Sequence, residues 1–265
     1  MEKFFEELDA LYQAGNVDRT EQFLKRYLEH CPREERITVL NELAGFYRGI
    51  SRYEESEAAS KEALQLLEKN GMENSAQYAT TMMNLAGTYR LSGRLDEAEG
   101  MMRQAAEMLD EEDYAYASTL NNLSLIYHKK GDIAKAEELA GAALTWMRSH
   151  GSPEHEVATS LNNLAAMKMS RGDWAGAAEL LEEALTFYKA MPEPNIHYAA
   201  ALSAKGVLCF RQGDLEGAEE AFERALLLDV YKRQLPDGGC CQEHGYQFRR
   251  KVTRGLYAEG YHVGS

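Results

Sequence analysis

The chain has 265 residues, of which 45% are hydrophobic and 27% charged, an ordinary composition for a soluble protein. Its formal net charge of −14 repels the phosphate backbone of nucleic acids, so we expect no nucleic-acid partner. No apolar run approaches the ~20 residues of a membrane-spanning helix, and the first residues lack the pattern of a signal peptide. We therefore predict a cytoplasmic protein without a membrane partner.

The first predicted element is a helical hairpin over residues 1–33, with its turn at Gly15-Asn16. Apolar residues recur at helical spacing on both sides of this turn. Thr20 and Tyr27 stand where the later hairpins have small residues. We expect this degenerate hairpin to cap the N-terminal end of the array, where one face meets water.

Five further hairpins are predicted because one residue pattern recurs along the chain at intervals of 42, 38, 41 and 41, by subtraction. The turn position carries Ser51, Gly93, Gly131, Gly172 and Gly213. Twelve positions after the turn, all five hairpins have an alanine: Ala63, Ala105, Ala143, Ala184 and Ala225. Alanine lets two crossing helices approach closely. The predicted hairpins span about residues 34–69, 74–109, 113–149, 154–190 and 195–229. Only helices are expected, so the predicted fold class is all-α.

The first helix of each hairpin carries a related motif. In the five regular hairpins the motif reads Leu40-Asn41-Glu42-Leu43-Ala44, Met82-Met83-Asn84-Leu85-Ala86, Leu120-Asn121-Asn122-Leu123-Ser124, Leu161-Asn162-Asn163-Leu164-Ala165 and, in a shorter form, Leu202-Ser203-Ala204. This pattern resembles the tetratricopeptide repeat in its long form, as in kinesin light chain and many bacterial repeat proteins. The resemblance covers roughly residues 35–229. It implies a right-handed α-solenoid that acts as a non-catalytic scaffold and binds a peptide or partner protein.

Residues 230–265 form a separate basic, glycine-rich segment without apolar periodicity. The hexapeptide that begins at Asp229 reads Asp-Val-Tyr-Lys-Arg-Gln, which a transposase adaptor of sequencing libraries encodes. We therefore expect this segment to be a sequence artefact, with further repeats in the natural protein. The alternative is a disordered basic tail.

No catalytic constellation is visible in the sequence. It contains no glycine-rich phosphate loop, no G-x-S-x-G motif and no His-Glu-x-x-His motif. Cys240-Cys241 with His244 resembles half of a zinc site, but the other ligands are not supplied. We predict that the chain is not an enzyme and that it uses no metal and no cofactor.

The resemblance implies that the first helices of the hairpins line a concave groove. The amides expected to face this groove are Asn41, Asn84, Asn121, Asn122, Asn162 and Asn163. An asparagine side chain offers two donors and one acceptor, which suits the main chain of a bound peptide. A second explanation stays open, in which these side chains tie neighbouring first helices together.

A further row of candidate residues lies near the ends of the first helices. It comprises Arg48, Arg90, His128, Met169 and Phe210, with Lys129 beside His128. In an acidic chain, this row favours a peptide with an acidic segment over its cations and an apolar anchor near Met169 and Phe210. Alternatively, the cations only complement the helix dipoles.

Two other functions stay open at this stage. The repeats could regulate a catalytic domain or partner, or they could sense a bacterial signalling peptide. The sequence identifies neither the partner nor the oligomeric state.

Overall fold

The computed structural model describes residues 1–191 and 196–233, which form twelve helices and no strand. The helices are α1 (Glu2–Ala14), α2 (Val17–His30), α3 (Arg36–Gly49), α4 (Tyr53–Lys69), α5 (Ala76–Ser92), α6 (Leu95–Glu107), α7 (Tyr114–Lys130), α8 (Ile133–Ser149), α9 (Glu154–Arg171), α10 (Trp174–Ala190), α11 (Ile196–Gln212) and α12 (Leu215–Arg233). The predicted tail lies outside the described residues from position 234 onward. The division into cap, repeats and tail stays a prediction.

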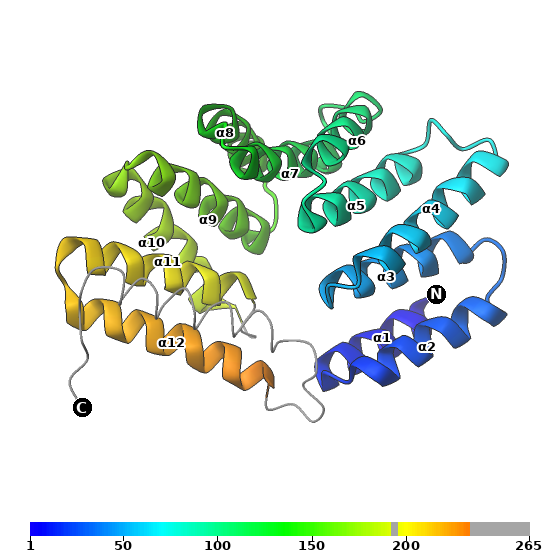
Figure 1. The fold of residues 1–265 in the computed structure, drawn as a ribbon, viewed down its shortest axis with the longest axis horizontal. Helices are drawn as coiled ribbons and strands as arrows, with labels where there is room; N and C mark the ends of the chain where they lie inside the picture. The colour runs from blue at the N-terminus through cyan, green and yellow to red at the C-terminus, as the bar shows by residue number, and fades with distance from the viewer. Residues whose placement is uncertain (192–195, 234–265) are drawn as a thin grey trace.

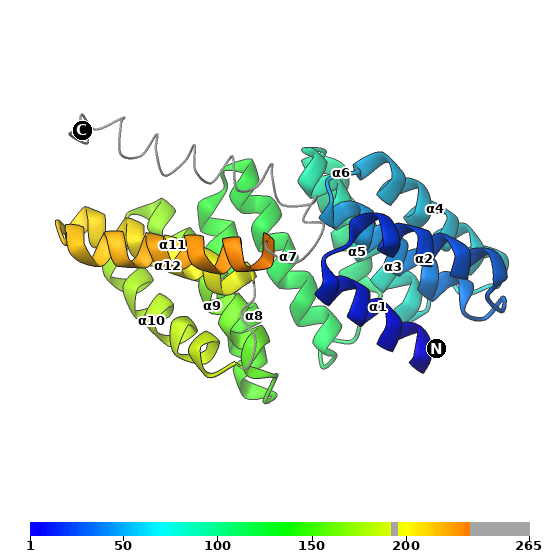
Figure 2. The same cartoon turned by 90° about the horizontal axis from the view of Figure 1, so that it is seen from below.

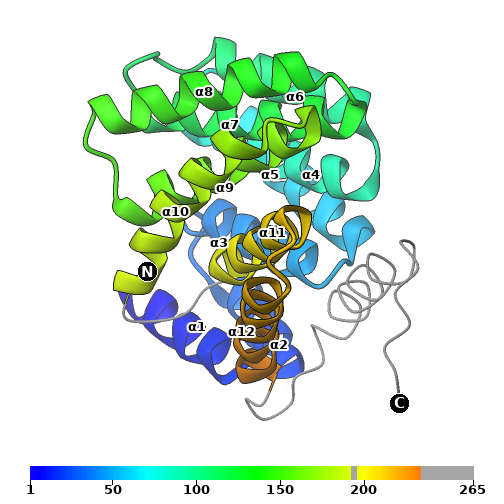
Figure 3. The ribbon, with the colours of Figure 1, turned by 90° about the vertical axis from the view of Figure 1, so that its left-hand side faces the viewer.

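Consecutive helices pair as hairpins, and the hairpins follow one another along a curved path. Figure 1 shows this path as an arc, with α3, α5, α7 and α9 on its inner side and α4, α6, α8 and α10 on its outer side. In Figure 2 the first hairpins lie at one end of the molecule and α11 and α12 at the other. Seen along the long axis in Figure 3, the chain rises from α1 and α2 to α6 and α8 and returns to α12. The predicted all-α, right-handed solenoid is confirmed.

Close helix crossings explain the recurring alanines. Ala63, Ala105, Ala143 and Ala184 have no exposed surface, and Ala225 is 1% exposed. A larger side chain at these positions would push the two helices of a hairpin apart, at a cost of about 1–3 kcal/mol. All five alanines are therefore buried, as the predicted close crossing of two helices requires.

Left-handed backbone conformations explain the recurring turn residue. Gly93, Gly131, Gly172 and Gly213 have φ between 80° and 88°, a region that glycine enters without steric cost. Ser51 adopts the same conformation, with φ of 61°, although it carries a Cβ. This turn is therefore strained in the second hairpin and relaxed in the hairpins that follow.

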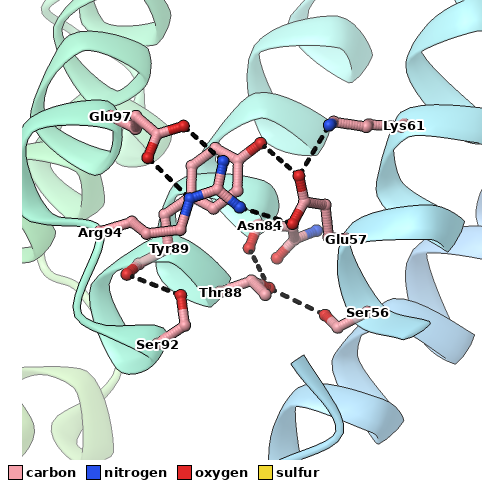
Figure 4. Close-up of polar contacts among 9 residues, drawn as sticks. All are labelled: Ser56, Glu57, Lys61, Asn84, Thr88, Tyr89, Ser92, Arg94 and Glu97. Carbon is pink, nitrogen blue, oxygen red and sulfur yellow. Dashed lines mark hydrogen bonds and ion pairs between the residues drawn. The ribbon is translucent and has the colours of Figure 1, made fainter. Parts of the chain in front are cut away.

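Neighbouring hairpins are joined through the partly buried carboxylate of a glutamate. Figure 4 shows this contact at one interface. The Tyr89 hydroxyl donates to Glu57 Oε1 over 3.0 Å, and Arg94 binds Glu57 Oε2 over 2.6 Å. The Arg94 guanidinium also lies 3.9 Å from the centre of the Tyr89 ring. Below this group, Ser56 Oγ and Thr88 Oγ1 share a hydrogen bond of 2.8 Å. A tyrosine and a cation on one hairpin thus hold a glutamate on the preceding hairpin.

Related contacts recur at three more interfaces, and we call the four glutamates the carboxylate ladder. Its members are Glu21, bound by Tyr47 and Arg52; Glu57; Glu99, bound by Tyr127 and Lys130; and Glu137, bound by Lys168 and Arg171. Each member lies six positions after the turn residue of its hairpin. The ladder fixes how successive hairpins stack, because each contact joins a second helix to the first helix or the turn of the next hairpin.

Candidate functional site

The candidate site is a strip of partly exposed residues on the first helices, which we call the inner strip. Between the buried core positions of these helices, the strip carries Thr38, Asn41, Glu42, Gly45 and Arg48 on α3; Thr80, Met83, Asn84, Gly87 and Arg90 on α5; Ser118, Asn121, Asn122, Leu125 and His128 on α7; Thr159, Asn162, Asn163, Ala166 and Met169 on α9; and Ala200, Ser203, Ala204, Val207 and Phe210 on α11. The helical spacing places these residues on one face of each helix.

Three of the predicted asparagines join neighbouring first helices. Asn41 Nδ2 donates to Thr81 Oγ1 over 3.0 Å and so links α3 to α5. Asn163 Nδ2 donates to Asn121 Oδ1 over 3.2 Å and links α9 to α7. These bonds have a structural role, as the second explanation of the amide row expects. Thr81 was not among the predicted residues, since its partner lies 40 positions away in the sequence.

The other predicted asparagines make different contacts. Asn122 Nδ2 donates to the Ser118 carbonyl of its own helix over 2.9 Å. Asn84 accepts from Arg48 through its main-chain oxygen. The Asn162 side chain makes no hydrogen bond with the described part of the chain, and neither does Asn121 Nδ2. The strip therefore keeps spare donors and acceptors near its middle.

Arg48 and Arg90 lie close together at the ends of α3 and α5. Arg48 reaches across to α5, where its Nη1 donates to the Asn84 carbonyl over 2.9 Å. A Cβ at Gly87 would lie 3.4 Å from this nitrogen, so the guanidinium lies directly against the backbone of α5. Burial lowers the pKa of both arginines, and the charge of Arg48 lowers the pKa of Arg90 further. The two guanidiniums thus repel one another in a half-buried setting.

The remaining predicted residues extend the strip toward α11. Lys129 Nζ donates to the Arg90 carbonyl over 3.2 Å, which brings a third cation to this region. His128 Nε2 and Ser170 Oγ share a hydrogen bond of 2.8 Å, and burial lowers the pKa of His128. Met169 is half-buried against the main core, and Phe210 is half-buried on α11. The proposed binding role of each of these residues stays a prediction.

An acidic region at the N-terminal end of the strip was not predicted from the sequence. Burial raises the pKa of Glu42, and the nearby Asp9 raises it further. Burial, with Glu42 and Asp9, raises the pKa of Tyr12 to about 12. The charge along the strip therefore changes from negative beside α1 to positive at Arg48 and Arg90. The missing signal was the packing of α1 against α3, which a repeat pattern does not encode.

Residues 1–191 and 196–233 contain no group of three or more His, Cys, Asp or Glu side chains that could hold a metal ion. None of their helices combines the length and apolar character needed to cross a membrane.

Comparisons with known proteins agree with this architecture. The sequence model of the tetratricopeptide repeat matches residues 35–111, 115–190 and 156–229. A comparison with curated proteins finds no match. Among solved structures, BtubC (BKLC) from P. vanneervenii is similar with a TM-score of 0.62 and 21% identity, over 84% of this chain and 92% of BtubC.

Two similar structures were solved as complexes. A Rap protein complexed with Competence and Sporulation Factor superposes with a TM-score of 0.70 and 15% identity, over 96% of this chain and 71% of Rap. NprR in complex with its cognate peptide NprX superposes with a TM-score of 0.72 and 13% identity, over 98% of this chain and 74% of NprR. At these identities the likeness concerns the fold alone.

Proposed function

The chain belongs to the tetratricopeptide repeat family, and we propose that it is a scaffold whose inner strip binds an extended peptide segment of a partner protein. The observation that carries this proposal is the unused hydrogen-bonding capacity of Asn121 Nδ2 and Asn162, on first helices that face the inside of the arc. Asparagine side chains at this spacing suit the main chain of a peptide, whatever its side chains.

The charges and apolar residues of the strip indicate which peptide it prefers. An acidic segment would lie over Arg48, Arg90 and Lys129, where positive charge gathers in an otherwise acidic protein. An apolar anchor would contact Val207, which is 38% exposed, together with Met169 and Phe210. The family is generally non-catalytic, so the proposed role is to position partners.

The experiment compares two adjacent asparagines with different structural roles. A ligand is selected from a displayed library of random peptides on the full chain, and its Kd is measured by fluorescence anisotropy. Asn162→Ala removes a side chain without an internal hydrogen bond, so we expect about fivefold weaker binding with an unchanged Tm. Asn163→Ala breaks the bond to Asn121, so we expect it to lower the Tm.

Asn74→Ala is the matched control, because Asn74 is exposed between α4 and α5, away from the strip. We expect this variant to bind like the wild type. If Asn162→Ala binds the selected peptide as tightly as Asn74→Ala does, the amide row is structural and the inner strip is not the binding face.

A second candidate function is the sensing of a short signalling peptide. It is favoured by the superposition on NprR, which was solved with its cognate peptide NprX, and on a Rap protein complexed with Competence and Sporulation Factor. A sensor should compact when it binds, since a peptide that contacts several first helices draws the hairpins together. Small-angle scattering with and without the selected peptide tests this, and an unchanged radius of gyration would favour a static scaffold.

A further inference from the structure

Arg48 and Arg90 differ from the other half-buried arginines of the described residues. Those others are Arg36, Arg52 and Arg94, and each of them forms an ion pair with at least one glutamate. Neither Arg48 nor Arg90 forms an ion pair within the described part of the chain. Because a half-buried charge without a counter-charge is costly, this exception needs a reason.

Arg90 is the more exceptional of the two. Its Nε is buried without a hydrogen-bond partner, and its terminal nitrogens bind no group of the described residues. Unlike Nε, these terminal nitrogens are not buried, so they reach the solvent. An arginine that only complemented the dipole of its helix would not need to bury its Nε. The Arg90 guanidinium instead has a buried Nε and terminal donors that remain unused.

Arg48 supplies the second half of the arrangement. Its Nη1 is anchored on the Asn84 carbonyl beside Gly87, while Nε and Nη2 make no hydrogen bond with the described residues. Gly87 lies beside this guanidinium, and a Cβ at that position would stand 3.4 Å from Arg48 Nη1. The helices thus hold two like charges near each other, both with donors that remain open.

We propose that Arg48 and Arg90 bind a phosphoryl group on the peptide that occupies the inner strip, an assignment that rests on the proposed function. A phosphate monoester carries about −1.5 to −2 charges at pH 7, which balances two guanidiniums, whereas one carboxylate balances a single guanidinium. Its three oxygens can accept from both arginines at once, in the forked geometry that arginine favours. The partner is therefore a phosphorylated segment.

The test uses the full chain and small probes, so it does not depend on finding the natural peptide. Three capped probes are compared at equal ionic strength: acetyl-phosphoserine-amide, acetyl-serine-amide and acetyl-Glu-Glu-amide. Binding is followed by NMR of the arginine Nε–H groups. We expect saturable binding of the phosphoserine probe, with a shift of the Arg90 resonance. Arg90→Gln should weaken this binding at least tenfold.

Two controls separate binding from structure. Arg33→Gln removes the same charge from an exposed residue between α2 and α3, and its affinity for the probe should equal that of the wild type. Arg90→Gln should keep or raise the Tm, because Arg90 makes no internal hydrogen bond that the change would break. A lower Tm would overturn the proposal by giving Arg90 a structural role.

Two further results would also overturn it: undiminished phosphoserine binding by Arg90→Gln, or equal affinity for the Glu-Glu probe. If the phosphoserine probe does not bind while Asn162→Ala still weakens the selected peptide, the phosphoryl site is wrong and the peptide-binding strip stands. If the probe binds and Asn162→Ala has no effect, an anion site exists outside a peptide-binding strip.

Discussion

Glu99 should contribute to stability in a way that depends on pH, because three donors surround its carboxylate. Lys130 Nζ binds Oε2 over 2.6 Å, the Tyr127 hydroxyl donates to Oε1 over 2.6 Å, and Arg103 Nε donates to Oε1 over 3.0 Å. The hydrogen bonds from Lys130 and Tyr127 lower the pKa of Glu99 from 4.5 to about 2. The change to test is Glu99→Gln, which keeps the size of the side chain and removes its charge.

The size of the effect follows from these two pKa values. Their difference corresponds to roughly 3 kcal/mol at most. Because the Glu99 side chain is 18% exposed at the edge of the molecule, solvent weakens the interaction, and we expect a loss of about 1–2 kcal/mol. For a chain of this size, that loss lowers the Tm by roughly 2–8 °C at pH 7.

The sign of the pH dependence is fixed by the lowered pKa. The stabilisation is fully present above the pKa of the unfolded state, near 4.5, and is lost as the pH falls through the folded value of about 2. The Tm gap between wild type and Glu99→Gln should therefore be largest above pH 5 and close between pH 4.5 and 2. Circular dichroism melts at several pH values measure it.

Glu107→Gln is the matched control on the same helix, since Glu107 is exposed. Its Tm should follow the wild type at every pH. A gap for Glu99→Gln that stays constant from pH 7 to pH 2, or an equal loss in Glu107→Gln, would refute the role of the ladder carboxylate.

Two other predictions concern the turns and one loop. Ser51→Gly should stabilise the protein by about 1 kcal/mol, because Ser51 holds a left-handed φ of 61°, and Gly93→Ala should destabilise it by a similar amount; urea midpoints measure both. No gain in Ser51→Gly would contradict this reading. His150 should titrate above 6.5 in an NMR experiment, because hydrogen bonds to the Trp146 carbonyl and to Glu112 raise its pKa. This contact stabilises the fold below pH 6.5 and is lost as the pH rises through the raised pKa, and Glu112→Gln should bring that pKa back toward 6.5.

Local features of the fold could be predicted because each depends on a few adjacent residues. Asp132 and Asp173, for example, each directly follow a turn glycine. Their side chains cap the second helix of the hairpin by accepting from the main-chain nitrogens of Lys135 and Gly176. The buried alanines are another example, because a helix crossing at a fixed distance from the turn demands a small side chain. Because the same residue pattern recurs in each hairpin, these local predictions apply along the whole array.

The candidate site could be predicted only as a set of positions. Asn41 bonds to Thr81, whereas Asn162 bonds to no described residue. This difference depends on side-chain conformations and on how the first helices are rotated against one another. The charge pair of Arg48 and Arg90 likewise needs the depth of burial, which the sequence does not state. Residue type gave the chemistry of the strip, while packing decided which groups remain unpaired.

The carboxylate ladder shows which long-range contacts a repeat sequence does encode. The loops between hairpins vary in length, so a glutamate and its tyrosine lie 26, 32 or 28 positions apart at the first three interfaces. Counted from the turns, however, the glutamate is always six positions after one turn, and its partner is four positions before the next. At the last interface the same two positions hold Ala178 and Cys209.

Both members of the polar pair are therefore absent together from the interface between α10 and α11. In their place, Lys205 Nζ binds Glu182 over 2.7 Å, and Arg211 lies 5.0 Å from the centre of the Trp174 ring. A glutamate alone at this interface would leave a carboxylate without its tyrosine donor, and a tyrosine alone would leave a hydroxyl without its acceptor. Replacing both residues therefore costs less free energy of folding than replacing one of them. Positions counted from the turns thus identify contacting pairs within this single sequence, where distance along the chain does not.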